Sequence, residues 1–283
     1  MAHFDQALAL YDPAEHRPLV TRFGADSRVN ILVMRSETAW MLGQPDVAAM
    51  DAEHGLKDAR EVNHAPTLML ALRDTSSTHA LRGSYATASA QADELVTLAD
   101  QKGALPWKVT GILIQGRLSA LTGKAWDAVS MLTSGIAALR SMGQTLIVPT
   151  SLSHLAMAHA EVGQFDDAWR CIREAIMTAE TSKVGGWWEA EFHRMAGEIA
   201  LKSPPSDAAK AESYFERALS VARAQQAKSW ELRAAMSMAR LWRDQGRQDE
   251  ARELLAPVYG WFTEGFDTLD LKEAKALLDA LAG

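Results

Sequence analysis

The stretch Gly163-Gln164-Phe165-Asp166-Asp167-Ala168 lies between two segments in which small and apolar residues fall three and four positions apart. This spacing puts the apolar side chains on one helix face, so it predicts two amphipathic helices joined by a turn at the glycine. The glycine recurs every 40 residues, at positions 43, 83, 123 and 163, and an alanine follows each one after five residues. Gly246 and Ala251 repeat the spacing. The period predicts stacked copies of one helix pair rather than a single closed core.

Composition and charge narrow the class of protein. The 283 residues are 48% hydrophobic with only 9 prolines, which is typical of a helical protein. A net charge of −7 and scattered basic residues give nucleic acid or a membrane surface no positive patch to bind. The single cysteine, Cys171, rules out a disulfide within the chain, and neither a secretory signal nor a bilayer-length apolar run is present. We therefore expect a cytoplasmic protein without nucleic-acid or membrane partners.

The turn resembles that of the tetratricopeptide repeat, whose pattern is Gly-x-[Tyr/Phe]-x-x-Ala. Residues 163–168 match it, residues 83–88 match it with Tyr85, and residues 123–128 match it with the aromatic residue one place later. The resemblance implies an all-α, right-handed superhelical solenoid of antiparallel helix pairs. Its helices would be longer than usual, because the common period is about 34 residues. HEAT repeats, which have a similar length, are the alternative, and the five-residue Gly-to-Ala spacing favours the tetratricopeptide type.

The repeat predicts one array over residues 1–283. We expect a partial repeat helix at 1–12, a loop from Asp12 to about Asp26, six helix pairs over about 28–262, and a C-terminal capping helix at 268–282. The last helix would begin with a capping box at Asp270 and Glu273. The first helix would belong to a pair whose other member precedes residue 1. We therefore expect that the chain is a fragment or that this end is covered.

Several blocks also resemble a narrower group, the C-terminal repeat region of bacterial proteins in which a class III adenylate/guanylate cyclase domain precedes a predicted ATPase module. The match is densest from about residue 154 onward, and the blocks that carry it lie at residues 7–13, 187–198, 222–229, 241–247 and 261–267. The resemblance implies that any cyclase or ATPase activity would reside in upstream domains absent from this chain. It implies a non-catalytic regulatory or interaction role in bacterial signal transduction, without a cofactor.

In tetratricopeptide arrays the first helix of each pair lines a concave groove. Carried onto this sequence, that arrangement makes these residues the candidates for partner binding: Trp40, Arg73, Arg117, Met157, Glu191, Arg194, Glu198, Arg233, Met236, Arg240 and Arg243. The last pair is basic, so an extended acidic peptide or a carboxylate terminus would suit it. Of Trp187 and Trp188, one is expected to pack in the core and the other to anchor a partner. The alternative for each residue is a solvated helix face.

Residues with potential chemistry do not form a catalytic pattern. Gly123-Lys124 lacks the spacing and the hydroxyl residue of a phosphate loop, and His154 and His159 are five apart, off the shared face that a zinc pair needs. His193 lies near two glutamates and could titrate near neutral pH, although a packing role is the simpler interpretation. Cys171 has no partner cysteine and is expected to be a buried small hydrophobe. We predict no catalytic residue and no metal ligand.

Three functions remain in order of preference. The first is a non-enzymatic scaffold whose partner is a protein, a peptide or an upstream domain of the same protein. The second is a receptor that takes a peptide or small ligand in its concave groove. The third, an enzyme in its own right, lacks a recognisable constellation of catalytic residues.

Overall fold

A computed structural model describes residues 1–182 and 184–282, and within these ranges every regular element is helical. The all-α prediction is confirmed. Internal contacts divide the chain into two compact units, Met1–Gln115 and Gly116–Gly283, and the boundary falls inside helix α8 (Leu105–Leu121). Within the described residues, no helix combines the length and the apolar character needed to cross a membrane.

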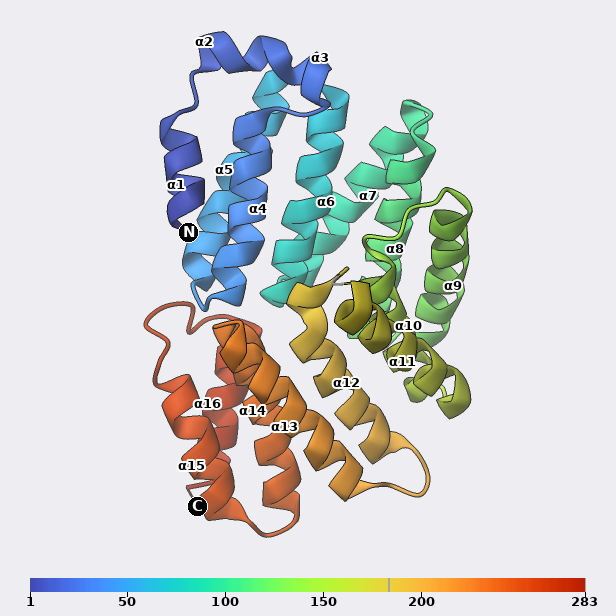
Figure 1. Ribbon diagram of the computed structural model, residues 1–283, viewed down its shortest axis with the longest axis vertical. Coiled ribbons are helices and arrows are strands. Elements are labelled where there is room, and N and C mark those ends of the chain that lie inside the picture. Colours follow the sequence, from blue (N-terminus) through green and yellow to red (C-terminus); the bar gives the residue numbers. More distant parts are fainter. Residues whose placement is uncertain (183, 283) are drawn as a thin grey trace. The chain divides into compact units, whose positions relative to one another are not determined.

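The N-terminal unit contains two complete helix pairs (Figure 1). Helix α4 (Ser27–Met41) pairs with α5 (Pro45–Val62), and α6 (Ala65–Leu81) pairs with α7 (Tyr85–Gln101). Helix α1 (Ala2–Ala9) packs against α4, and the first part of α8 completes the unit. The core has Val29, Leu72 and Leu95 at its centre, each fully buried.

The segment expected to be a loop between Asp12 and Asp26 is helical in part, so that expectation was wrong. It forms α2 (Pro13–His16), the 3-10 turn η1 (Arg17–Leu19) and α3 (Val20–Phe23). The Asp12 carboxylate accepts a hydrogen bond from the Ala14 backbone N–H, and the proline that follows it has a φ suited to the first turn of a helix. Gly24, with φ of 78°, ends α3.

The C-terminal unit contains four helix pairs that begin with the end of α8, and a final helix. Their bounds are α9 (Ala125–Ser141), α10 (Val148–Glu161), α11 (Phe165–Ser182), the 3-10 turn η2 (Gly186–Trp188), α12 (Glu189–Lys202), α13 (Ala208–Ala224), α14 (Lys228–Asp244), α15 (Gln248–Tyr259) and α16 (Leu269–Ala280). Helix α16 packs against both members of the last pair, α14 and α15 (Figure 1).

The repeated Gly and Ala positions have the roles that their spacing predicts. Each turn glycine has a left-handed backbone, with φ between 78° and 82° at Gly43, Gly83, Gly123, Gly163 and Gly246. This conformation strains any residue with a Cβ, which explains the choice of glycine. The alanine five positions later is fully buried in every copy, at Ala48, Ala88, Ala128, Ala168 and Ala251. A larger residue there would overpack the place where two helices meet.

Gly197 shows how closely the paired helices approach. A Cβ added at this position of α12 would lie 2.3 Å from Cε1 of Phe215 on α13. Phe215 is itself fully buried, so its ring has no free space into which to retreat. The absence of a side chain at residue 197 therefore sets the distance between these two helices.

Candidate functional site

In the C-terminal unit, charged residues of α12 and α14, each the first helix of its pair, lie close to one another and to the final helix α16. Glu191, Arg194 and Glu198 are spaced three and four apart on α12, so they share one side of that helix. Arg233 of α14 and Asp270 of α16 are in ion-pair contact with this group. We call these five residues, together with Ser237, the first-helix cluster.

Glu191 and Arg194 form the centre of the cluster. Nε and Nη2 of Arg194 donate to the two carboxylate oxygens of Glu191 at 2.8 and 2.7 Å, in a bidentate pair. The side chains are 2% and 17% exposed, so this pair is largely removed from water. Nη1 of Arg194 also contacts Glu198 at 3.2 Å. The guanidinium is thus held from two sides and its orientation is fixed.

Two further contacts connect α12 to α14, and a third connects α14 to α16. Ser237 of α14 donates to Glu198 at 2.6 Å. Arg233 donates through Nε to Asp270 at 2.9 Å, and its Nη1 lies 3.7 Å from Glu191. The cluster therefore links α12, α14 and α16 by charge.

Burial and neighbouring charge compete in setting the pKa values of the cluster. Burial alone would raise the pKa of Glu191, but the charge and hydrogen bonds of Arg194, with Arg233 and Arg117 nearby, outweigh it and hold the pKa below its usual range. For Asp270 the burial effect prevails over Arg233, and its pKa is raised. The pKa of Arg194 is raised by its two glutamates despite burial, so its charge is permanent.

Aromatic residues adjoin the cluster. The rings of Trp188 and Trp230 lie 4.9 Å apart, and the guanidinium of Arg117 lies 4.9 Å from the centroid of the Trp188 ring. The Arg233 guanidinium lies 5.3 Å from the Trp230 ring. His154 of α10 meets Trp188 edge to face at 5.9 Å. Arginines over indole faces combine charge with flat apolar surface, a combination that is common where proteins recognise peptides.

The structure separates the two candidate tryptophans. Trp188 is 3% exposed, whereas Trp187 is 42% exposed, and the backbone carbonyl of Trp187 accepts a hydrogen bond from the Trp230 indole. The packing member is therefore Trp188, and the accessible one is Trp187. Whether Trp187 anchors a partner stays a prediction.

The remaining candidates differ in accessibility. In α14, Arg240 pairs with Glu273 at 2.7 Å and Arg243 pairs with Asp244 at 2.8 Å; their side chains are 40% and 39% exposed. Met236 is buried, and Met157 is half-buried. Among the candidates on α14, Arg240 and Arg243 are therefore the charges accessible to a partner.

The N-terminal unit holds the other two candidates, Trp40 and Arg73. Trp40 is 2% exposed. Arg73 donates to the carboxylate of the adjacent Asp74 and lies 5.4 Å from the Trp107 ring centroid. The role of either residue in binding stays a prediction.

Sequence reasoning missed one member of the cluster, Ser237, and the adjoining Trp230, and it misassigned Asp270. Asp270 was expected to belong to a capping box, but α16 begins after Thr268 without a side-chain cap, and Asp270 pairs with Arg233 instead. Neither Ser237 nor Trp230 was a candidate. Both lie on α14 three or four residues from Arg233, so the helical spacing could have placed them on the same face. For His193 the sequence left open a packing role, the preferred interpretation, or titration near neutral pH; the residue is buried, and burial, followed by Arg217, lowers its pKa to about 4.

Comparison with solved structures identifies the fold. The apo form of RapI aligns with a TM-score of 0.58 at 11% identity, over 89% of this chain and 84% of that one. A Rap protein in complex with competence and sporulation factor aligns with a TM-score of 0.58 at 12% identity, over 90% and 74%. A tetratricopeptide repeat protein from Parabacteroides merdae aligns with a TM-score of 0.56 at 11% identity, over 94% and 90%.

These likenesses confirm the tetratricopeptide-like helical repeat fold, and at such low identity they show the fold alone. No family model matches the sequence, and no curated protein is significantly similar to it.

Proposed function

We propose that this chain is a non-catalytic scaffold that binds an extended acidic segment of a protein or peptide along the first-helix face of the C-terminal unit. The observation that carries the proposal is the presence of three arginines on the helices of that face, Arg194 of α12 with Arg233 and Arg240 of α14; Arg233 also lies over the Trp230 ring. Acidic neighbours hold the first two in place, so little side-chain entropy remains to be lost on binding.

Arg240 is the best entry point for a partner carboxylate. Its guanidinium is accessible, and its present partner, Glu273, is itself 45% exposed. Exposed ion pairs of this kind contribute about 0–1 kcal/mol, so a bidentate partner carboxylate can replace Glu273 at small cost. Trp187, at 42% exposure, offers an apolar contact on the same unit.

The solved neighbours support a binding role. One of the Rap structures is a complex with competence and sporulation factor, and this binding is a property of that Rap protein. Stacked helix pairs present long surfaces suited to extended partners. A receptor that takes a peptide in the same groove is the alternative, and it differs from a scaffold in whether binding changes the conformation of the chain.

A peptide-display selection on the immobilised chain tests the proposal. We expect enrichment of sequences with several Asp or Glu residues or a free terminal carboxylate. Arg240→Glu should weaken binding of the selected peptides by about tenfold to a hundredfold, as the loss of one charge-assisted hydrogen bond predicts. Arg252→Glu makes the same charge change at an exposed position of the second helix α15 and should leave binding unchanged. Enrichment of basic or apolar peptides, or equal effects of the two variants, would refute the proposal.

We further infer that the chain is the regulatory region of a larger bacterial signalling protein of the cyclase–ATPase type. The support is the block resemblance from residue 154 onward, together with the lack of a recognisable catalytic constellation in the sequence. Cyclase and ATPase assays on the purified chain test this inference, and we expect no turnover above the buffer blank. Turnover that survives further purification would show that this chain is itself an enzyme.

A further inference from the structure

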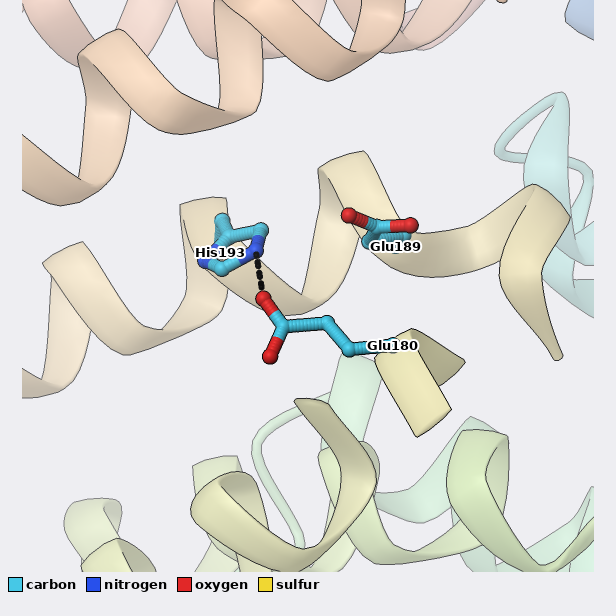
Figure 2. A group of neighbouring side chains, drawn as sticks. All are labelled: Glu180, Glu189 and His193. Atoms are coloured by element: carbon cyan, nitrogen blue, oxygen red, sulfur yellow. Dashed lines mark ion pairs between the residues drawn. The ribbon is translucent and has the colours of Figure 1, made fainter. Parts of the chain in front are cut away.

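Three potential metal ligands converge where α11 is followed by α12. Glu180 comes from the last turns of α11, and Glu189 and His193 come from the first turns of α12 (Figure 2). Because Glu189 and His193 are four residues apart, their side chains project from the same face of α12. Each of the three residues offers a ligand atom that lies within 4.8 Å of the other two.

His193 is unusual among the buried polar groups of the unit. It is 5% exposed, and neither ring nitrogen has a hydrogen-bond partner among the described residues. Nε2 lies 3.8 Å from Oε1 of Glu180, beyond hydrogen-bond range, and Figure 2 shows the ring facing that carboxylate. A buried imidazole without a partner loses the hydrogen bonds that it makes in water, so such groups call for an explanation.

We propose that Glu180, Glu189 and His193 bind one divalent transition-metal ion such as Zn²⁺. One imidazole and two carboxylates form a donor set that suits Zn²⁺, and water would fill the remaining coordination position. The imidazole excludes a preference for Mg²⁺ or Ca²⁺, which take oxygen ligands. Coordination through Nε2, the nitrogen that faces Glu180, would satisfy one of the two orphaned ring nitrogens and join two consecutive helix pairs.

The geometry needs only a small adjustment. Ligand atoms around a tetrahedral ion with bonds of about 2.0–2.2 Å lie about 3.4 Å from one another. Glu180 is 44% exposed and carries its carboxylate on two methylene groups, so rotation about its side-chain bonds can bring that carboxylate closer to His193.

The neighbouring charges permit this binding. Among the described residues, Arg217 of α13 is the positive group in ion-pair contact with the site, and its Nη2 lies 3.6 Å from Glu189. Its side chain is 54% exposed, so it can move into solvent, where its charge is screened. Tyr214 of α13 stacks against His193 at 6.3 Å and limits rotation of the ring.

The test uses the purified chain, freed of metal by chelation. Titration with Zn²⁺ against a fluorescent zinc chelator should give one site per chain, and Co²⁺ should give a visible d–d absorption band of a low-symmetry site. Glu180→Gln should lower the Zn²⁺ affinity at least about tenfold, because even the loss of an outer-shell partner weakens metal sites by about 10- to 100-fold. His193→Gln should abolish the Co²⁺ band.

Glu253→Gln provides the matched control. It makes the same change at an exposed position of α15 and should leave Zn²⁺ binding unchanged. Circular dichroism of each variant separates lost binding from lost folding, and Glu180→Gln changes a side chain that is 44% exposed. Stoichiometry below one, or equal affinity in Glu180→Gln and the control, would overturn the proposal.

Discussion

Glu191 and Arg194 face each other in a bidentate ion pair in which the glutamate side chain is 2% exposed and the arginine side chain 17%. Removing one member of a buried pair leaves an uncompensated charge in the interior, which costs about 3–5 kcal/mol. Because Arg194 keeps its contact with Glu198, we expect Glu191→Gln to lower the free energy of unfolding by the lower end of that range, about 3 kcal/mol, and urea denaturation followed by circular dichroism measures it.

Glu198→Gln provides the comparison for that prediction. Glu198 also accepts from Arg194 but is 24% exposed, so water can replace part of what is lost. We expect a loss of about 1 kcal/mol, the usual net value of one hydrogen bond. Equal losses in the two variants would show that burial of Glu191 is not what makes its pair with Arg194 important.

The close approach of α12 and α13 predicts the effect of a single methyl group. In Gly197→Ala the new Cβ would lie 2.3 Å from Cε1 of the buried Phe215, so the ring or a helix must move. Overpacking of this kind costs about 1–3 kcal/mol. Gly186→Ala, where nothing lies within 4 Å of the new atom, should change the stability little. Thermal unfolding compares the two variants, and a stable Gly197→Ala would mean that the helices are less tightly packed than the structure indicates.

His154 predicts a loss of stability in acid. It is 3% exposed, and burial, followed by the charges of Arg117, Arg233 and Arg194, lowers its pKa well below the ordinary value. The unfolded chain therefore takes up a proton as the pH falls through about 6.5, while the folded chain does not. The free energy of unfolding should fall below that pH, by at most about 1.4 kcal/mol per pH unit from this residue.

His154→Gln isolates that contribution, because glutamine is polar and does not titrate. The variant should show a shallower decline in the free energy of unfolding between pH 6.5 and 5 than the parent chain. An unchanged slope would assign the acid sensitivity to other groups.

Much of the fold could be predicted because its signals are local. A left-handed turn favours glycine, and a close helix crossing favours alanine. Gly163 and Ala168 meet these two requirements only five residues apart, so both are visible in one short stretch of sequence. The helical turns between Asp12 and Asp26 were missed because each is only three or four residues long. Elements of that length show no complete apolar period from which a helix could be predicted.

The candidate site was less predictable because its contacts are not local. Periodicity made Arg233 a candidate on the first helix of the last pair, but nothing near it in the sequence indicates that its partner is Asp270, which is 37 residues away. The capping-box spacing at Asp270 even pointed to a different role. His193 likewise acquires its carboxylate neighbour Glu180 from the preceding helix, across a connection whose path the sequence does not specify.

Cys171 provides a probe of opening in the C-terminal unit. The residue is fully buried, and burial raises the pKa of its thiol, so both access and thiolate content are low. We expect a disulfide reagent at pH 8 to modify the native chain only as fast as the unit opens, and to react at once in denaturing urea. Ser130→Cys, at an exposed position of α9, places a second thiol in the same unit for reference. Equal reaction rates of Cys171 and this reference thiol in the native chain would contradict the prediction. They would mean that α11 packs more loosely against its neighbours than the structure shows, and that the Cys171 thiol is accessible to reagents.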